Sequence, residues 1–218
     1  MSVTDYIGRF WTGAEVMYGI IITMTFTSML RDIPVVPDIV VDRLIIAALS
    51  CCIAWGIADG FFYLWERGYI IRRENTIIDL SRSSEVKQSA VSMVGEELDD
   101  TILRTIPLEK RQYLYEKLVL FLSSSGQRRS IAIPEAVIIV LGTFLRSAGA
   151  SLIMVAPFFI IDDVWEALLI SNVTGILLLF IVGYIRSLDR TFSSRVLFGL
   201  GSGLIGIIIA AITVVLGG

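Results

Sequence analysis

The chain contains no histidine, and charged residues make up only 18% of its 218 positions. Histidine is the commonest general base and the commonest transition-metal ligand, so any metal site here must use carboxylate, thioether, thiol or backbone oxygen. No Ser–His or Cys–His arrangement is available for a hydrolase, so we expect no enzyme and no resident cofactor. The G-x-x-x-x-G-K-[ST] loop is missing too, which argues against ATP-driven pumping. The formal net charge of −3 comes without a basic block, which argues against a nucleic-acid partner.

Cysteine is scarce as well, with two residues in the chain. Cys51 and Cys52 are adjacent and lie inside an apolar run. Adjacent cysteines rarely meet the geometry of a disulfide, so we expect two reduced, buried thiols rather than a disulfide or a redox pair. We expect no cleavable secretory signal either, because the first apolar stretch is long, follows Asp5 and Arg9, and has no small-x-small cleavage site.

Apolar sequence, by contrast, is abundant: 55% of the residues are hydrophobic and the mean hydropathy is +0.78. A soluble domain is usually about 45–50% apolar. Here the charges are concentrated between five continuous apolar runs, each long enough for a helix of roughly 20 residues to cross a bilayer. Because the runs do not alternate between apolar and polar residues, they do not fit a membrane β-barrel. The expected spans are residues 10–30, 44–65, 131–161, 164–185 and 196–216.

These runs predict an all-α integral membrane protein with five transmembrane helices and a cytosolic helical insert between spans two and three. The predicted parts are transmembrane residues 1–66, the insert at 67–130 and transmembrane residues 131–218. Lysine and arginine favour cytosolic loops, and they gather in the insert and in the loop between spans four and five. A five-span count puts these two segments on the same side. We therefore expect a cytosolic N-terminus and insert, and an external C-terminus.

The insert is expected to contain a stalk that continues the second span, followed by two further helices. Ser83 or Ser84 can cap the first of these helices, because serine accepts hydrogen bonds from the free amides of a first turn. Pro107 suits the first residue of the second helix, where a missing amide hydrogen costs little. The predicted ranges are 67–80 for the stalk, 83–104 for the first helix and 107–122 for the second.

Ionisable residues inside the predicted spans are candidates for function, because charge is costly to bury in a bilayer. With the predicted topology, four carboxylates lie in the cytosolic half: Glu15, Asp59, Glu66 and Glu135. Two plainer interpretations remain open. In one, Asp59 pairs with Arg146 near the middle of the third span and holds two spans together. In the other, the three glutamates lie at the membrane interface with their carboxylates in water.

Carboxylates and thioethers together suit a divalent transition metal such as iron(II) or manganese(II). Asp59 and Glu66 are seven residues apart and share one helix face, and Met17 and Met24 are related in the same way. With Glu15 they form a candidate metal path. Methionine is more often a packing residue than a ligand, so packing remains the alternative for both methionines.

The insert holds the densest acidic cluster of the chain. Glu96, Glu97 and Asp100 lie within about one helical turn of one another, a spacing that can chelate a hard cation. The alternative is a solvated acidic face without a ligand. In the fifth span, Gly199 and Gly203 form a G-x-x-x-G pair, which favours close helix packing or dimerisation rather than chemistry.

The second span also contains the motif A-W-G-x-x-D, which ends at Asp59 and is followed one turn later by Tyr63. Five spans, an internal N-terminus, an acidic helical insert after the second span and this motif resemble the vacuolar iron transporter family of iron and manganese carriers, in a bacterial branch. The resemblance implies a homodimer in a prokaryotic plasma membrane, surrounded by lipid, that moves divalent metal ions. Family members usually carry D-G and a following proline in span one, whereas this chain has Glu15 and no proline there.

In the family, an aspartate and a methionine of span one line the metal path at a dimer interface. The resemblance places Glu15 at the position of that carboxylate and Met17 or Met24 at the position of the thioether. Glutamate and methionine side chains of the family's insert collect metal. The nearest equivalents in this chain are Met93, Glu96, Glu97 and Asp100.

We therefore expect a dimeric carrier that moves iron(II) or manganese(II) from the cytosol outward or into a compartment, in exchange for protons. The insert would collect the ion and pass it to Glu15, Asp59 and Glu66. A second hypothesis is a non-transporting membrane scaffold or metal sensor whose insert docks a partner. A third is an intramembrane enzyme, which is disfavoured because the sequence shows no nucleophile–base pair.

Overall fold

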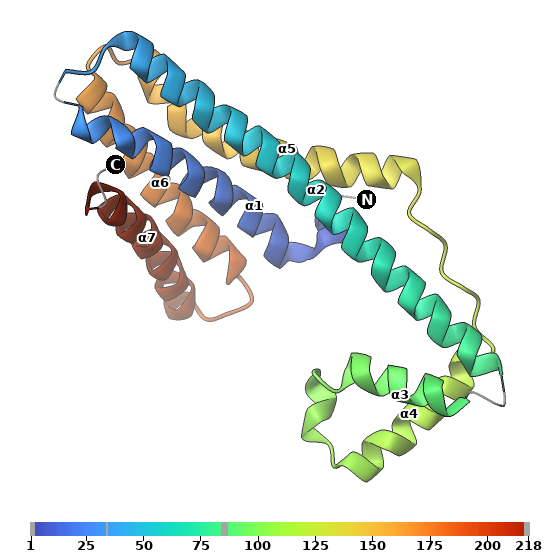
Figure 1. The fold of residues 1–218 in the computed structure, drawn as a ribbon. Helices are drawn as coiled ribbons and strands as arrows, with labels where there is room; N and C mark the ends of the chain where they lie inside the picture. The colour runs from blue at the N-terminus through green and yellow to red at the C-terminus, as the bar shows by residue number, and fades with distance from the viewer. Residues whose placement is uncertain (1–2, 34, 84–86, 216–218) are drawn as a thin grey trace. The chain divides into compact units, whose positions relative to one another are not determined.

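The computed structural model describes residues 3–33, 35–83 and 87–215. The chain is 85% helical and its described residues form no strand, which confirms the predicted all-α class (Figure 1). The described helices, with η for short 3-10 helices, are α1 (Val3–Ser28), η1 (Met29–Asp32), α2 (Asp38–Arg82), α3 (Lys87–Leu98), η2 (Ile102–Thr105), α4 (Leu108–Leu122), α5 (Ile133–Val155), η3 (Ala156–Phe159), α6 (Val164–Arg186) and α7 (Phe192–Val215).

Five of the described helices are long and apolar enough to cross a membrane, namely α1, α2, α5, α6 and α7. Each overlaps one of the predicted runs, so the predicted number of membrane-spanning helices is confirmed. The helix α2 has 45 residues and is therefore about 68 Å long at a rise of about 1.5 Å per residue. A hydrocarbon core is only about 30 Å thick, so the predicted stalk is the continuation of the same helix.

The helix α1 and the long third predicted run are each interrupted near one end. In α1, Gly8 has a φ of 80°, a left-handed conformation that glycine adopts without steric cost and that breaks the helix there. The candidate membrane span of α1 includes Trp11 and continues to Arg31 in η1. The long third run splits after Val155 into the 3-10 turn η3, because Pro157 has no amide hydrogen to continue the helical hydrogen bonds.

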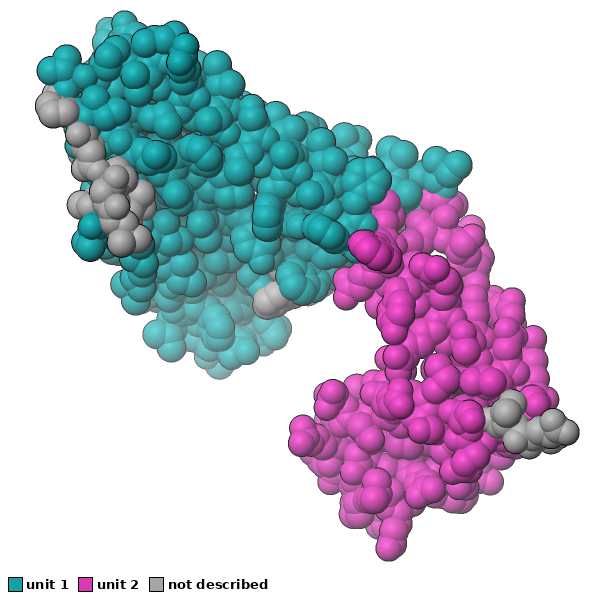
Figure 2. Space-filling view, in the orientation of Figure 1, with its two compact units in different colours: residues 1–63, 133–218 teal, residues 64–132 magenta. Residues whose placement is uncertain are grey.

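Two compact units divide the chain, Met1–Tyr63 with Ile133–Gly218 and Leu64–Ala132 (Figure 2). The helix α2 contributes residues to both units. The first unit contains the remaining membrane-spanning helices, and the second contains α3, η2 and α4.

In the first unit, α1 and α5 run parallel to each other and α2 runs in the opposite direction. This alternation is what a chain that crosses the membrane back and forth requires. The contacts that fix the directions are Gly19 with Ser147, Thr23 with Ser151, Gly56 with Ser147, and Cys52 with Thr23.

The first unit buries polar side chains and exposes apolar ones. Thr23, Thr143, Ser147 and Ser151 are all fully buried. Large apolar side chains cover the outside of the same helices, as at Leu152 of α5, which is 56% exposed. A protein dissolved in water buries its aliphatic side chains first, so this exterior is suited to lipid rather than to water.

Three glycines of α7, Gly199, Gly203 and Gly206, pack against α6 within the same chain. A Cβ at Gly199 would come within 2.8 Å of the Phe180 ring, and one at Gly206 within 2.7 Å of Leu179. On α6, a Cβ at Gly183 would meet the Ser202 hydroxyl at 2.3 Å. The G-x-x-x-G spacing of the fifth span thus serves helix packing, one of its two predicted roles.

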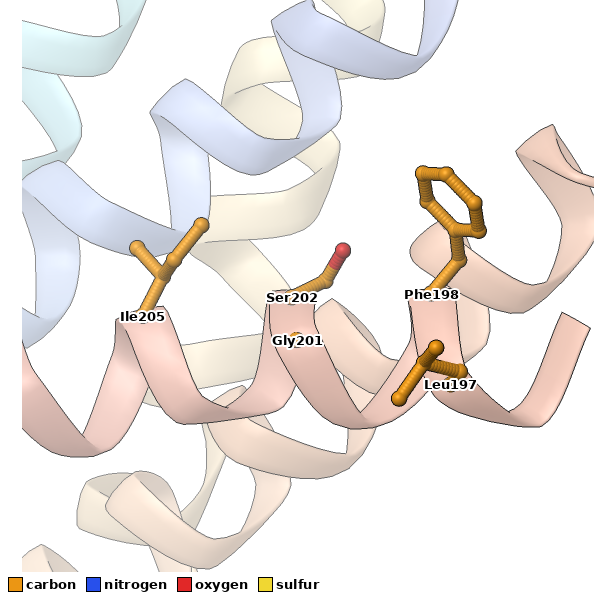
Figure 3. A pocket seen from close by; sticks show the side chains of 5 residues that line it. All are labelled: Leu197, Phe198, Gly201, Ser202 and Ile205. Atoms are coloured by element: carbon orange, nitrogen blue, oxygen red, sulfur yellow. The ribbon is translucent and has the colours of Figure 1, made fainter. Parts of the chain in front are cut away.

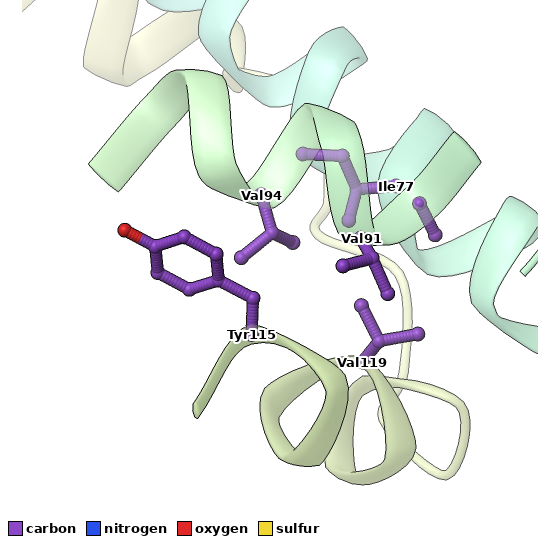
Figure 4. Packing of buried hydrophobic residues seen from close by; sticks show 6 residues of the cluster. Ile77, Val91, Val94, Tyr115 and Val119 are labelled. Atoms are coloured by element: carbon purple, nitrogen blue, oxygen red, sulfur yellow. The ribbon is translucent and has the colours of Figure 1, made fainter. Parts of the chain in front are cut away.

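The second unit has a small apolar core of its own between α3, α4 and the end of α2. Figure 4 shows Tyr115 and Val119 of α4 on the side of α4 that faces Val91 and Val94 of α3. The buried members of this core are Ile77, Ala90, Val91, Val94, Tyr115 and Val119.

The first helix of the insert is shorter than the predicted range of 83–104, because α3 ends at Leu98. The carboxylate of Asp99 accepts hydrogen bonds from Arg111 at 2.5 Å and from Tyr115 at 2.8 Å, both on α4. The Thr101 hydroxyl then accepts from the amide of Leu103 and starts η2. These contacts end α3, so that part of the prediction was wrong.

The caps of the insert helices also differ in detail from the prediction. Ser83 directly follows α2, and Ser84 lies outside the described residues. The second predicted helix is confirmed as α4, with Pro107 immediately before its first residue, Leu108.

Candidate functional site

The carboxyl group of Glu15 on α1 is the most deeply buried charged group among the described residues. Glu15 is 0% exposed and lies among the apolar helices of the first unit. Its Oε1 accepts a hydrogen bond of 2.9 Å from the hydroxyl of Tyr63 on α2. Its Oε2 has no hydrogen-bond partner in the described chain. Burying a carboxyl group with one oxygen unsatisfied is costly, which marks Glu15 as a candidate for function.

Asp59 on α2 is an electrostatic neighbour of Glu15 and also lies next to Trp55. Two acidic groups from different helices thus meet inside the bundle, as the sequence predicts. Arg146 of α5 also acts electrostatically on Glu15. Its guanidinium donates to the carbonyl oxygen of Gly142 at 2.9 Å.

The pairing of Asp59 with Arg146, one of the alternatives left open by the sequence, is not formed. Both residues are described, and no ion pair joins them in the described part of the chain. Asp59 therefore acts as a neighbour of Glu15 and not as the counter-ion of Arg146 on α5.

A seam of small and polar residues continues from Glu15 along the interface of three helices. On each helix the members recur at every fourth residue, which places them on one face. We call this set the polar seam. Its members are Glu15, Gly19, Thr23 and Thr27 on α1, Gly60, Gly56 and Cys52 on α2, and Thr143, Ser147 and Ser151 on α5.

Hydrogen bonds connect the middle of the polar seam across the helices. The Thr23 hydroxyl lies 2.7 Å from the Ser151 hydroxyl and 3.7 Å from the Cys52 sulfur. The Cys52 thiol in turn donates to the carbonyl oxygen of Gly19 at 3.6 Å. One turn closer to Glu15, the buried Ser147 hydroxyl has no partner in the described chain. The seam thus contains both satisfied and unsatisfied polar groups in an apolar bundle.

Glycines make this close approach of the three helices possible. A Cβ at Gly19 would come within 2.4 Å of the Ser147 carbonyl oxygen, and one at Gly60 within 2.6 Å of Val140 Cα. Because backbone atoms cannot yield easily, only glycine fits at these positions. The motif A-W-G-x-x-D therefore contributes Asp59 to the site and Gly56 to the packing on α5.

The other candidate ligands of the predicted metal path have contacts or surroundings of their own. The Met17 sulfur accepts from the Arg186 guanidinium at 3.3 Å. Met24 is fully buried in an apolar cluster together with Met154, which is the packing role that the sequence left open. Glu66 is exposed and belongs to the second unit. Among the described residues, no group of three acidic, cysteine or histidine side chains is placed to hold a metal ion.

The acidic residues of the insert take part in ion pairs. Arg73 of α2 pairs with Glu96 at 2.9 Å and also with Glu97. Asp100 is exposed, and Met93 packs against the apolar core of the second unit. Glu96 and Glu97 thus form an ion-pair network around Arg73, and its guanidinium occupies the position in which they would hold a metal cation.

The sequence did not assign roles to several residues that the structure brings to the site. Tyr63 is the hydrogen-bond donor to Glu15, although the two residues are far apart in sequence. Thr143, Ser147 and Ser151 contribute the polar face of α5. Their recurrence at every fourth residue within an otherwise apolar run was the one signal that pointed to a buried polar face.

One pocket lies away from this site, along α7 (Figure 3). It has a volume of about 460 Å³ and a lining that is almost entirely apolar. With a single hydroxyl, that of Ser202, the pocket offers no set of ligands for an ion. The lining residues are Leu197, Phe198, Gly201, Ser202 and Ile205.

Comparison with protein-family models, with curated proteins and with solved structures finds no match to this chain.

Proposed function

We propose that this chain is a membrane carrier for a divalent metal cation, iron(II) or manganese(II), with Glu15 and Asp59 as its binding carboxylates. The observation that supports this most directly is the fully buried Glu15, whose Oε2 has no partner in the described chain while Asp59 lies beside it. A cation between the two groups would supply the missing partner and neutralise both charges.

The donor chemistry of the site fits a hard or borderline divalent cation. Two carboxylates are typical protein ligands for manganese(II), which keeps water molecules in its remaining positions. Protons can replace the cation on the same carboxylates, so metal and proton would alternate at Glu15 and Asp59. This alternation provides a simple means of exchange without ATP.

The proposal includes a topology and an assembly. The N-terminus and the second unit, which corresponds to the predicted insert, lie in the cytosol, because lysines and arginines concentrate in the insert and in the loop between α6 and α7. The C-terminus lies outside, in a prokaryotic plasma membrane, and the carrier works as a homodimer, as the resemblance to vacuolar iron transporters implies. Metal would reach the bundle through the insert by competing with Arg73 for Glu96 and Glu97.

Uptake of manganese(II) into proteoliposomes under an imposed pH gradient tests the proposal. We expect the purified full-length chain to give a manganese(II) flux above that of empty vesicles. Glu15→Gln and Asp59→Asn should each lose at least nine-tenths of this flux, and a tenfold loss corresponds to roughly 1.4 kcal/mol. The matched control is Glu166→Gln, which removes an exposed carboxylate from the first turn of α6. Wild-type flux no higher than that of empty vesicles would overturn the proposal.

A second candidate function is a non-transporting scaffold or metal sensor. It is supported by the ion pairs of Arg73 with the insert acids and by the exposed apolar residues of α4, such as Leu120 and Phe121, which suit a protein partner. Two results together would favour it over the carrier: Asp59→Asn lowers the thermal stability of the protein in detergent, and calorimetry finds the same metal binding before and after the substitution.

A further inference from the structure

A second set of buried polar atoms without partners lies on α1 and α6. Asn172 of α6 is only 5% exposed, and neither its Oδ1 nor its Nδ2 has a hydrogen-bond partner in the described chain. On α1, Ser28 is fully buried and its hydroxyl likewise has no partner there. The neighbouring Ser171 differs, since its hydroxyl donates to the Met154 carbonyl oxygen at 2.7 Å.

Contacts on either side place Ser28 and Asn172 opposite each other. The Met24 sulfur lies 2.9 Å from the position that a Cβ of Gly175 would occupy. Further along, Leu30 of η1, which directly follows α1, and Leu168 of α6 belong to one apolar cluster. The two helices are therefore antiparallel. One turn beyond Met24 is Ser28, and about one turn before Gly175 is Asn172.

Each buried polar group that is left without a hydrogen-bond partner lowers the stability of the folded chain. An apolar bundle that only needed packing would place leucine or alanine at these positions, as it does at Leu168. Polar atoms that are retained in a membrane interior in this way point to a ligand with polar chemistry.

We propose that Ser28 and Asn172 form a second binding station for the transported cation, built from neutral oxygen donors. The inference rests on the proposed carrier function and adds an exit step to it. The amide oxygen of Asn172 and the hydroxyl of Ser28 are ligand types that hard divalent cations accept together with water.

The two stations differ in charge and in depth. Glu15 and Ser28 are separated by about 20 Å along α1, at a rise of about 1.5 Å per residue. The Glu15 station carries carboxylates and holds a cation strongly, whereas the Ser28 station is neutral and releases it easily. The polar seam leads from the first station to Thr27, next to Ser28.

An apolar cluster lies beyond the second station. Leu30, Ile45, Val155 and Leu168 belong to this cluster, which joins η1, α2, α5 and α6. This apolar barrier would therefore keep a cation bound at Ser28 and Asn172 from leaving until these helices separate, as alternating access requires.

The test combines manganese(II) flux in proteoliposomes with equilibrium binding of manganese(II) to the detergent-solubilised full-length chain. For Asn172→Leu we expect flux to fall at least tenfold, while binding, which is dominated by the carboxylates, stays within twofold of wild type. Ser28→Ala should lower flux severalfold in the same pattern. The control is Ser171→Ala. The Ser171 hydroxyl already has a hydrogen-bond partner, the Met154 carbonyl oxygen, so this variant should keep wild-type flux.

Asn172→Asp extends the test, because a charged second station should retain the cation. We expect slower dissociation of manganese(II) from the chain and lower flux. If Asn172→Leu does not yield a monodisperse protein, Ser28→Ala and Asn172→Asp decide the question.

The outcomes separate this inference from the proposed function. Unchanged flux in the Asn172 and Ser28 variants, with wild-type transport intact, overturns the second station and leaves an internal water as the occupant of these groups. Absence of manganese(II) binding and flux in the wild-type protein overturns the carrier itself.

Discussion

The hydroxyl of Tyr63 donates to Oε1 of Glu15 over 2.9 Å and ties α2 to α1 at the candidate cation site. Tyr63→Phe removes this donor and leaves a buried carboxyl group without a hydrogen bond from the described chain, at a cost of about 1–3 kcal/mol. Because the bond also orients Glu15, we expect manganese(II) affinity to fall by about tenfold, which corresponds to about 1.4 kcal/mol. Isothermal titration calorimetry of the detergent-solubilised protein measures this affinity.

The matched control for that substitution is Tyr184→Phe on α6. The Tyr184 ring stacks on Phe180, at a centroid distance of 6.3 Å, so the substitution keeps the ring packing and removes only a hydroxyl. Equal affinities for wild type, Tyr63→Phe and Tyr184→Phe would show that Tyr63 does not organise the site.

The number, type and approximate bounds of the membrane-spanning helices were predictable from the sequence. Runs of about 20 apolar residues leave a helix as the only way to satisfy the backbone inside a bilayer without a barrel. The similar depth of Glu15 and Asp59 also followed from their positions along the helices, whereas the burial of Glu15 had an alternative in which its carboxylate lay in water. Both predictions depend on periodicity and on hydrophobicity, which a single sequence contains.

Other features depended on contacts between residues far apart in the chain. Asp59 had two acceptable partners in the sequence, Glu15 and Arg146, and only the packing of α2 against α1 and α5 decided between them. The end of α3 at Leu98 is set by Arg111 and by Tyr115, which reach Asp99 from α4. Neither choice leaves a local signal, because the deciding partner is not a sequence neighbour.

Gly60 should not tolerate a side chain, because a Cβ there would lie 2.6 Å from Val140 Cα and 2.7 Å from the Thr143 hydroxyl. Gly60→Ala must push α2 away from α5, and overpacking of this kind costs about 1–3 kcal/mol. We expect a lower unfolding temperature in detergent, together with weaker manganese(II) binding. The control is Gly149→Ala on α5, where nothing lies within 4 Å of the new Cβ. An unfolding temperature for Gly60→Ala that equals the control would contradict the close packing of these helices.

Arg73 competes with any cation for Glu96 and Glu97 of the insert. Both carboxylates are substantially exposed, at 63% and 48% of the side chain, so the pairs contribute little to stability. Arg73→Gln should therefore leave the unfolding temperature nearly unchanged and raise the affinity of the insert for manganese(II) severalfold. Titration in the Glu15→Gln background isolates the insert from the membrane site. Affinity that stays the same in Arg73→Gln would argue that these acids form a solvated face and collect no metal.

Alkaline pH should loosen the second unit through Tyr115. Burial, and then the hydrogen bond to Asp99, raise the pKa of the Tyr115 hydroxyl above its ordinary value. A raised pKa in the folded state means that the contribution of this group to stability is complete below the ordinary tyrosine pKa of about 10. The contribution is lost as the pH rises through the folded-state value. Chemical denaturation, monitored through hydrogen exchange at the amides of α3 and α4, measures this loss of stability.

Tyr115→Phe should be less stable than wild type at neutral pH, because it loses one hydrogen bond, and the difference should shrink as the pH rises above about 10. Tyr113→Phe is the control, because the Tyr113 side chain on the same helix is 63% exposed. It should follow the wild-type profile throughout. If the gap between wild type and Tyr115→Phe stays constant across the alkaline range, the Tyr115 hydroxyl is not the group whose ionisation loosens the contact between α3 and α4.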